Sequence, residues 1–282
     1  MKPKVIVICG PTASGKTSLS IELAKRIKGE IISCDSMQIY KDMTIGTAKP
    51  TVEEMDGIPH HLIDFVLPSE RYSVADFKKA ATQKIEEILS RNKIPIIVGG
   101  TGLYVDALVY NIEYLELETD LKYRQELENL IEQKGLEELY EKAKQIDEQA
   151  MQSISKNDKK RIMRVLEIYH QTGKTKTQLE AESRLTPPPY DYIVFAITMD
   201  REKLYERINR RVDIMIEQGL IEEVQSLVNK YKEFPTAMQG LGYKEVVEYI
   251  EGETTKEEMI EKLKMETRRY AKRQLTWFRK NK

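Results

Sequence analysis

The chain has 282 residues, which corresponds to about two domains of roughly 150 residues or to one large domain. Hydrophobic residues make up 40% of the chain and charged residues 32%, a mixture that can build a sizeable core and excludes intrinsic disorder. The 45 lysines and arginines nearly balance the 46 aspartates and glutamates, so the formal net charge of −1 indicates no polyanionic partner by itself.

Cysteine usage and hydropathy restrict where the protein acts. The two cysteines, Cys9 and Cys34, are too few for a disulfide framework or a four-ligand zinc site, and we expect buried thiols in a reducing compartment. The first apolar run spans only residues 5–9, too short for a signal peptide, and no run approaches the roughly 20 residues of a membrane helix. We therefore expect a cytoplasmic protein with no membrane span.

Short apolar runs alternate with amphipathic patterns over the first third of the chain. Residues 4–9, 31–34 and 94–98 have the composition of buried strands, and residues 74–89 have helical periodicity. Apolar strands that alternate with amphipathic helices are typical of a parallel sheet covered on both faces. The predicted fold class is α/β, a P-loop NTPase-like parallel sheet with helices on both faces.

The pattern changes after residue 116. Residues 120–180 contain no convincing strand and predict three or four charged amphipathic helices. A strand-like run resumes at residues 192–197, and the remainder is helical with a break at 234–242. We predict a core formed by residues 1–116 and 190–282, interrupted by an all-helical insertion domain at residues 117–189.

A phosphate-binding motif lies between the first predicted strand and the first predicted helix. It matches the pattern G-x-x-x-x-G-K-[ST] and comprises Gly10, Pro11, Thr12, Ala13, Ser14, Gly15, Lys16 and Thr17. The glycines allow backbone N–H groups to point inward at a helix N-terminus, Lys16 adds a positive charge, and the Thr17 hydroxyl is a candidate Mg²⁺ ligand. A second GKT at residues 173–175 lacks the first glycine and is predicted to lie between helices.

The motif alone does not identify the phosphate-containing ligand. Such loops are common in ATP-binding proteins, but they grip any two linked phosphates. The strand at residues 94–98 ends in Gly99-Gly100-Thr101, without the carboxylate that binds Mg²⁺ in many ATPases, which argues against a motor ATPase.

Asp35 directly follows the second predicted strand. Ligands of doubly wound sheets bind at the carboxyl ends of the strands, so Asp35 is expected near the P-loop as a Mg²⁺ ligand or a general base. Aspartate is also a favoured helix N-cap, and its position alone does not decide between these interpretations.

Several stretches match the motifs of one family, in order, over nearly the whole chain. They are GPTASGKT (10–17), ISCDSMQIYKDMTIGTAKP (32–50), PHHLIDF (59–65), YSVADF (72–77), PIIVGGTGLYVDAL (95–108), NDKKRIMRVLEIY (157–169), TGKT (172–175), QGLGYKE (239–245) and TRRYAKRQLTWFR (267–279). On these motifs the sequence resembles the tRNA dimethylallyltransferase (isopentenyl-diphosphate:tRNA transferase) family.

The resemblance implies transfer of a dimethylallyl group from dimethylallyl diphosphate to N6 of the adenine 3′ of the anticodon, in tRNAs that read codons beginning with U. It implies that the P-loop holds the donor diphosphate, with Mg²⁺ as cofactor. It also implies that Asp35 accepts a proton from N6, that Thr101 contacts the reacting end, and that Arg211 helps to bind the diphosphate.

The expected partner is a tRNA anticodon stem-loop, contacted in part by the insertion domain, and the protein is expected to be a monomer. By the same resemblance, the residues expected to contact tRNA are Asp35, Ser36, Met37, Gln38, Thr101, Lys159, Lys160, Arg161, Arg164, Gln239, Gly240, Gly242, Tyr243 and Lys244.

The distribution of charge supports an RNA partner. Residues 113–148 carry twelve acidic and five basic residues, whereas residues 261–282 carry nine basic and two acidic ones. On residues 158–169, Lys160, Arg161 and Arg164 lie off the apolar helical face that Ile162, Val165, Leu166 and Tyr169 form. Basic helices are often only solvated, so this pattern alone is weak support.

Other residues near these motifs have simpler interpretations. Of Arg207, Arg210 and Arg211, we expect two to be solvated or paired with acidic neighbours. His60 and His61 have no partner with ligand spacing and predict a structural turn rather than a metal site. Tyr40 and Tyr104 are candidates to line the pocket of the prenyl group.

Three other functions remain open from the sequence alone. A nucleoside or small-metabolite kinase would use the same P-loop, but it would have no need of the helical insertion. A non-catalytic RNA-binding switch would bind nucleotide without needing Asp35. A prenyltransferase that acts on free adenylate would leave the insertion and the basic helices without a purpose.

Overall fold

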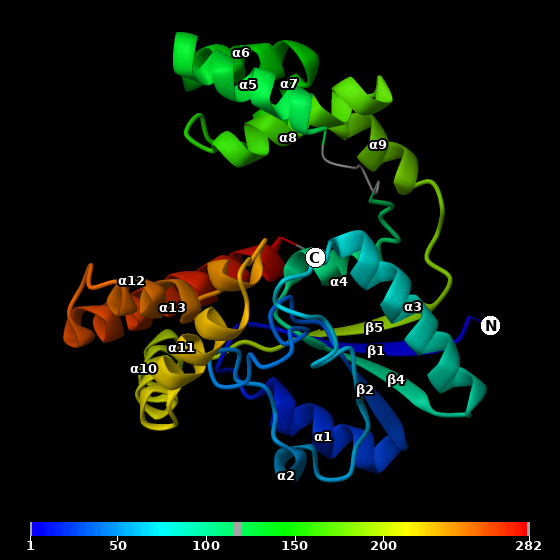
Figure 1. The fold of residues 1–282 in the computed structure, drawn as a ribbon. Helices are drawn as coiled ribbons and strands as arrows, with labels where there is room; N and C mark the ends of the chain where they lie inside the picture. The colour runs from blue at the N-terminus through cyan, green and yellow to red at the C-terminus, as the bar shows by residue number, and fades with distance from the viewer. Residues whose placement is uncertain (1, 115–119, 281–282) are drawn as a thin grey trace. The chain divides into compact units, whose positions relative to one another are not determined.

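The computed structural model describes residues 2–114 and 120–280 (Figure 1). In chain order the elements are β1 Lys4–Cys9, α1 Lys16–Ile27, β2 Gly29–Ser33, α2 Val52–Met55, β3 His60–His61, α3 Val74–Ser90, β4 Ile94–Gly99, α4 Gly102–Val109, α5 Leu121–Lys134, α6 Leu136–Ile146, α7 Glu148–Met151, α8 Lys159–Thr172, α9 Lys176–Ser183, β5 Asp191–Ala196, α10 Arg201–Glu217, α11 Leu220–Lys230, the 3₁₀ turn η1 Ala237–Gln239, α12 Tyr243–Ile250 and α13 Lys256–Arg279. The predicted strands and the helix predicted at residues 74–89 are confirmed, with ends that differ by a residue or two.

The strands form one parallel sheet in the order β3-β2-β4-β1-β5. The central strand β1 pairs Ile6 with Ile96 of β4 on one side and with Ile193 of β5 on the other. Because the strands are parallel, the loops that follow β1, β2 and β4 meet at one edge of the sheet, where ligands of such folds bind. The prediction of an α/β fold built on a parallel sheet is confirmed.

Alternate residues of the inner strands face two different helical layers. Val7 and Ile97 pack against α3 and α4 in one core cluster, whereas Ile8 and Ile96 pack against α1 in another. This division follows from the period of two in strand side chains. The sheet was predicted to be covered by helices on both faces. The outer strand β5 is an exception, since its Phe195 is 53% exposed.

The prediction of a structural turn at His60 and His61 is wrong, because these residues form the short edge strand β3. Their backbone pairs with Ile31 and Ile32 of β2, and a ring nitrogen of His61 hydrogen bonds to the Glu30 carboxylate at 2.8 Å. Two residues are too few to show the alternation by which a strand is recognised in a sequence.

Helices α10 to α13 are grouped together (Figure 1) and pack on the loop that follows β2. Ile39 and Met43 of this loop share a buried cluster with Val212, Leu227 and Val246 of the helices. The loop after β2 is therefore held by helices that are about 170 to 220 residues further along the chain.

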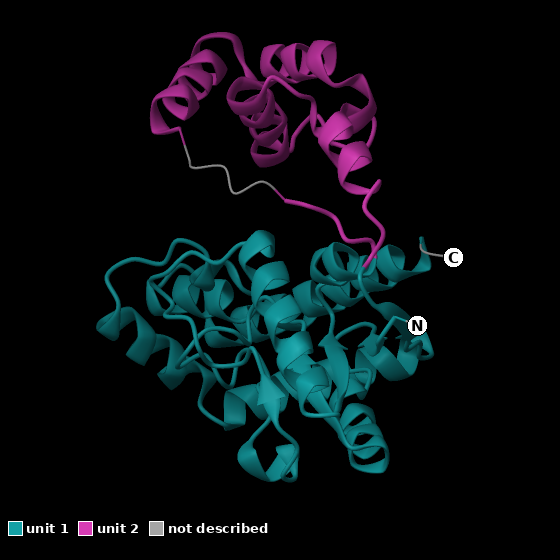
Figure 2. Ribbon diagram, turned by 90° about the vertical axis from the view of Figure 1, so that its right-hand side faces the viewer, with its two compact units in different colours: residues 1–109, 189–282 teal, residues 110–188 magenta. Residues whose placement is uncertain are grey.

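The chain divides into two compact units, one formed by Met1–Val109 and Pro189–Lys282 and the other by Tyr110–Pro188 (Figure 2). The domain boundary predicted between residues 116 and 117 lies outside the described residues. The boundary predicted between residues 189 and 190 compares with a division between Pro188 and Pro189 in the structure.

The regular secondary structure described within residues 110–188 is entirely helical. Its five helices, α5 to α9, share a core that includes Leu127, Leu139 and Leu166. The prediction of three or four helices missed the four-residue α7, which begins where the Asp147 carboxylate accepts hydrogen bonds from the Ala150 N–H and the Thr177 hydroxyl.

Both cysteines are buried and unpaired, as predicted. Within residues 2–114 and 120–280, no helix has the length and apolar character needed to cross a membrane.

We expect Phe77→Ala to lower the free energy of unfolding by about 3–5 kcal/mol, because the ring is fully buried and stacks on Tyr104 at 4.1 Å. Urea unfolding followed by circular dichroism measures the change. Val52→Ala is the control, since Val52 is 80% exposed and its truncation should change stability by less than about 0.5 kcal/mol. Equal effects of the two substitutions would contradict the assignment of Phe77 to the core.

Candidate functional site

The loop between β1 and α1 has the backbone shape of an anion-binding nest. Gly10, Ala13 and Gly15 have positive φ angles of 149°, 61° and 90°, which turn the chain sharply from the strand into the helix. At Gly10 a Cβ atom would lie only 2.8 Å from the carbonyl oxygen of Ile197, so only glycine fits. Since the loop ends at the N-terminus of α1, its N–H groups can hold phosphate oxygens.

The Lys16 ammonium is enclosed by this loop. Its Nζ donates hydrogen bonds to the carbonyl oxygens of Gly10 at 3.0 Å and Pro11 at 2.6 Å. Burial lowers the pKa of Lys16 to about 8, an effect that nearby Asp35 opposes and nearby Arg211 reinforces. A negatively charged group beside Lys16 would therefore stabilise the ammonium and be bound by it.

A cavity of about 870 Å³ opens beside the loop, within the unit that contains the sheet. The predicted site residues that line it are Thr12, Ala13, Ser14, Gly15, Lys16, Thr17, Asp35, Gln38 and Arg211. Gly10 and Pro11 support it from beneath through their bonds to Lys16. The structure thus brings the P-loop, the loop after β2 and helix α10 around one space.

Two arginines of α10 face the cavity together, at positions four residues apart. Arg207 and Arg211 both line it, and Arg207 also approaches the P-loop at Gly15. Burial, followed by repulsion from Arg207, lowers the pKa of Arg211, while Glu54 opposes this effect. As expected, two of the three arginines of this helix, Arg207 and Arg210, are exposed to solvent, but helical spacing brings Arg207 as well as Arg211 to the same cavity wall.

Asp35 serves partly as a cap and partly as a cavity residue. Its Oδ1 accepts hydrogen bonds from the N–H groups of Met37 at 2.8 Å and Gln38 at 3.3 Å, which closes a turn at residues 36–39 rather than the start of an α-helix. Among the described residues, none donates a hydrogen bond to Oδ2. The two interpretations of Asp35 are therefore compatible, because one oxygen shapes the loop and the other remains available.

Thr101 ties the loop after β4 to the loop after β2. Its hydroxyl accepts a hydrogen bond from the Ser36 N–H at 3.0 Å and can donate to the Ser36 hydroxyl at 3.3 Å. The loops approach so closely that a Cβ atom on Gly99 would lie 2.0 Å from the Cys34 carbonyl oxygen. Thr101 itself does not line the cavity.

Helix α13 closes the site with residues to which the sequence analysis assigned no role. The Gln274 Oε1 accepts a hydrogen bond from the Thr12 N–H at 2.8 Å, and its Nε2 donates to the Gly100 carbonyl at 2.9 Å. Tyr270 also lines the cavity, beside Thr101 and Gln274, and burial raises its pKa so that it stays a neutral hydroxyl. Gln274, buried in the fold, therefore bridges the loops after β1 and β4.

Tyr40 and Tyr104, predicted as candidates for the prenyl pocket, do not line the cavity. Tyr40 is buried and its hydroxyl is 2.6 Å from that of Thr236, while the Tyr104 ring stacks on Phe77. Their proximity in sequence to the motifs suggested the site, but both rings fill the core.

The basic residues predicted to contact tRNA in the insertion lie on α8. Ile162, Val165 and Leu166 are buried in the core of this unit, but Tyr169, predicted on the same face, is 42% exposed. The basic side chains are partly or largely exposed, and three of them form ion pairs with nearby acidic groups: Lys159 with Glu128, Arg161 with Asp158 and Arg164 with Glu167.

The second GKT, at residues 173–175, lies between helices as predicted. Gly173 ends α8 and Thr175 caps α9.

Residues 239–244 pack against the loop after β2 rather than forming an open surface. A Cβ atom on Gly240 would lie 2.4 Å from the Met37 side chain, and Gly242 is buried with a φ angle of 93°. The Tyr243 side chain was predicted to contact tRNA, but it is fully buried and cannot contact tRNA directly in this structure. Gln239 and Lys244 remain exposed.

Comparison with known proteins decides the family. The family model described as IPP transferase matches residues 38–281. The chain belongs to the IPP transferase family. It is 55% identical over 277 residues to the tRNA dimethylallyltransferase of Acetivibrio thermocellus, covering 98% of this chain and 88% of that protein. It is 50% identical to the tRNA dimethylallyltransferase of Halalkalibacterium halodurans, over 99% of this chain and 89% of that protein.

Solved structures of IPP transferases have the same fold. The crystal structure of the tRNA isopentenylpyrophosphate transferase of Bacillus halodurans superposes with a TM-score of 0.73 at 48% identity, over all of this chain and 88% of that one. A eukaryotic dimethylallyltransferase acting on tRNA gives a TM-score of 0.82 at 36% identity, over 98% of this chain and 69% of that one. The family model begins after the P-loop and Asp35.

We expect Gln274→Ala to weaken the binding of inorganic pyrophosphate by about tenfold, because the half-buried Thr12 N–H and the buried Gly100 carbonyl lose their partner and the P-loop is less well held. Isothermal titration calorimetry measures the affinity. The control is Thr276→Ala on the exposed side of the same helix, for which the affinity should not change. A variant Gln274→Ala that binds pyrophosphate as the unmodified protein does would contradict this role.

Proposed function

We propose that this protein is a tRNA dimethylallyltransferase. It transfers the five-carbon group of dimethylallyl diphosphate to N6 of the adenine 3′ of the anticodon, in tRNAs that read codons beginning with U, and produces N6-isopentenyladenosine and diphosphate. The observation that carries the proposal is a single cavity that joins a phosphate-binding loop and three cations to the carboxylate of Asp35, in a chain about half identical to enzymes of that name.

The cationic part of the cavity binds the donor diphosphate. The N–H groups of the P-loop cradle the phosphates, and Lys16, Arg207 and Arg211 offset their charge. As the allylic C–O bond breaks, negative charge grows on the leaving diphosphate, and the same groups stabilise it. Ser14 supports this assignment, because its hydroxyl is buried and has no hydrogen-bond partner among the described residues, so a phosphate oxygen would satisfy it.

The residues present fit a Mg²⁺ ion that is held mainly through the diphosphate. The Thr17 hydroxyl lines the cavity and is an oxygen donor of the kind that Mg²⁺ prefers. Among the described residues, no three acidic, histidine or cysteine side chains are placed so that together they could hold a metal ion, and the proposed Mg²⁺ would therefore depend on substrate oxygens. Bound there, Mg²⁺ would supply additional charge stabilisation to the diphosphate.

Asp35 accepts the proton in the transfer. The adenine amine is a poor nucleophile because its lone pair is delocalised into the ring, and a carboxylate that accepts its N–H orients and deprotonates it. The C1–O bond of the donor breaks, the C1–N6 bond forms, and the N6 proton moves to Asp35. The Oδ1 bonds of Asp35 to the turn at residues 36–39 keep the carboxylate in place during this step.

The tRNA binds both units of the chain. The target adenine leaves its stack in the anticodon loop and enters the cavity, at a cost of a few kcal/mol. Exposed basic side chains of α8 contact phosphates of the anticodon stem-loop, a type of contact that gives affinity and salt dependence rather than sequence specificity. We expect the enzyme to act as a monomer in the cytoplasm, where its tRNA substrates are.

The direct test is transfer of label from dimethylallyl diphosphate to unmodified tRNA. Labelled RNA in the presence of Mg²⁺, with diphosphate released in equal amount, is the expected result. Absence of label with both substrates and Mg²⁺ present would rule the activity out. Consumption of ATP coupled to phosphorylation of a small acceptor would indicate a kinase instead.

We expect Asp35→Asn to lower kcat by roughly 10²–10⁴-fold, because the amide cannot accept the N6 proton. The amide oxygen can still accept the N–H bonds of Met37 and Gln38, so the turn and the tRNA affinity should be largely retained. Single-turnover kinetics and filter binding measure the two quantities. An Asp35→Asn variant with unchanged kcat would show that another group accepts the proton.

We expect replacement of both Lys160 and Arg161 by alanine to weaken tRNA binding. The slope of log K against log salt concentration should become shallower by about 1–2, since each lost phosphate contact removes about one from that slope. The matched control is replacement of Lys142 and Lys144 of α6 by alanine, which removes the same charge from exposed positions of the same unit. The same loss of affinity in both variants would indicate a general charge effect instead of a contact by α8.

A further inference from the structure

The segment of residues 43–49, which we call the cavity loop, forms one wall of the proposed active site. Thr44, Ile45 and Thr47 of this loop line the cavity together with Asp35. The loop follows Asp35 in sequence but belongs to no strand or long helix. What holds it in place therefore determines the shape of the wall.

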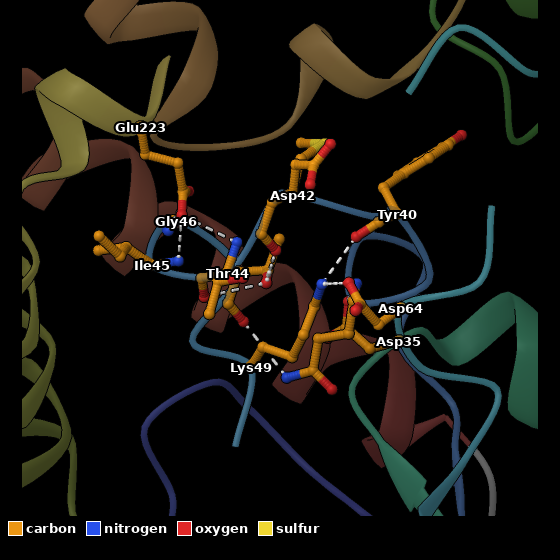
Figure 3. A network of polar contacts seen from close by, with 12 residues as sticks. Asp35, Tyr40, Asp42, Thr44, Ile45, Gly46, Lys49, Asp64 and Glu223 are labelled. Carbon is orange, nitrogen blue, oxygen red and sulfur yellow. Dashed lines mark hydrogen bonds and ion pairs between the residues drawn. The ribbon is translucent and has the colours of Figure 1, made fainter. Parts of the chain in front are cut away.

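Glu223, on the first turn of α11, grips the backbone of the cavity loop (Figure 3). Its Oε2 accepts hydrogen bonds from the N–H groups of Thr44 at 3.0 Å and Ile45 at 2.7 Å, and its Oε1 accepts one from the N–H of Gly46 at 3.1 Å. The Tyr243 hydroxyl donates a fourth bond, to Oε1, at 2.7 Å. Two carboxylate oxygens have about four acceptor sites, so four donors saturate them.

The loop also packs closely against the Tyr243 ring, beside this carboxylate. A Cβ atom on Gly46 would lie 2.6 Å from the Tyr243 ring, which is itself fully buried. Burial, and next the charge of Glu223, raise the pKa of Tyr243, so the hydroxyl remains a donor. The Tyr243 ring packs against Gly46 while the Glu223 carboxylate binds the N–H groups of residues 44–46, so together they hold this part of the loop in place.

The opposite side of the cavity loop holds the residues next to Asp35. The carbonyl oxygens of Thr47 and Ala48 accept hydrogen bonds from the Gln38 side-chain amide, at 3.3 and 3.2 Å. The Gln38 N–H in turn donates to Oδ1 of Asp35. A continuous series of hydrogen bonds therefore leads from Glu223 through the loop and Gln38 to Asp35.

Met43, at the start of the loop, is fully buried among the C-terminal helices and anchors that end, but the other polar contacts of the loop are weaker than those of Glu223. Bonds within the loop, such as that of the Lys49 N–H to the Thr44 carbonyl, fix its shape but not its position. Asp42, just before the loop, binds Lys230 and Tyr231 at the surface, where an ion pair contributes little. Lys49 binds Asp64 and the Tyr40 carbonyl, but only at the far end of the loop.

We propose that Glu223 is a positioning residue for the transfer reaction, which sets the place of Asp35 through the cavity loop and Gln38. This inference rests on the proposed function. Glu223 does not line the cavity, and its effect on the reaction is indirect. A misplacement of the reacting groups by about 1 Å can cost 100-fold in rate.

The test uses Glu223→Gln in the full chain, assayed for transfer to tRNA. The amide has one acceptor oxygen, and its NH₂ group would face backbone N–H groups. We expect kcat to fall by about 10- to 100-fold, with tRNA affinity within about twofold. Glu222→Gln removes the same charge from the neighbouring exposed position and should keep the rate of the unmodified protein. The kcat of Tyr243→Phe should fall less than that of Glu223→Gln, because Tyr243→Phe leaves the three backbone hydrogen bonds to Glu223 in place.

Two further measurements separate positioning from a general loss of structure. Hydrogen exchange followed by mass spectrometry should show faster exchange of residues 44–46 in Glu223→Gln, with β4 unchanged. In a double-mutant cycle, Glu223→Gln and Gln38→Ala should have less than additive effects on kcat, because they interrupt the same series of bonds.

The inference is overturned if Glu223→Gln keeps kcat within twofold of the active unmodified protein, or if the two substitutions in the cycle are additive. It is also overturned if the substitution accelerates hydrogen exchange in β4 as much as in residues 44–46, because that would indicate global destabilisation. If the unmodified protein itself transfers no label, the proposed function fails, and the exchange of residues 44–46 still decides whether Glu223 anchors the loop.

Discussion

Repulsion among cations clustered at one cavity is the constraint on which the rest of the site depends. Lys16, Arg207 and Arg211 face one cavity, and burial lowers the pKa of both Lys16 and Arg211. Such an arrangement costs free energy unless opposite charges or carbonyl dipoles offset it. The protein supplies some of these, in Asp35, Glu54 and the carbonyls beneath Lys16, and a bound polyanion would supply the remainder. The site is thus built to be completed by its ligand.

Holding these charges in place requires loops that approach one another very closely. Gly10 and Gly99 allow neighbouring backbones to approach to distances that no side chain would permit. Gln274 then joins the loops after β1 and β4, and Glu223 seats the loop after β2. Both side chains come from the C-terminal helices. The phosphate-binding loop is therefore supported by Gln274, 262 positions from Thr12, and the loop after β2 by Glu223, so the two ends of the chain belong to one unit.

Much of the fold could be predicted because its signals are local. Apolar runs marked β1, β2, β4 and β5, and the glycine spacing marked the P-loop with its flanking strand and helix. The predictions failed where the sequence signal was short, and they were incomplete where several residues had the same signal. β3 and α7 are too short for a period to appear, and the basic residues of α10 looked alike until helical geometry turned Arg207 as well as Arg211 toward the cavity. Tyr40 and Tyr104 lay beside motifs in sequence but fill the core.

The sequence by itself determined the chemistry that is available: a nest for linked phosphates, a lysine within it, and a carboxylate directly after the second strand, in motifs that resemble one family. These features are local, because a few neighbouring residues specify a turn or a strand end. Only the tertiary structure decided which distant groups complete the site. Arg207, Gln274 and Glu223 gain their roles from contacts across the fold, and a hydrogen bond or a cavity wall depends on distance in space, which no local pattern encodes.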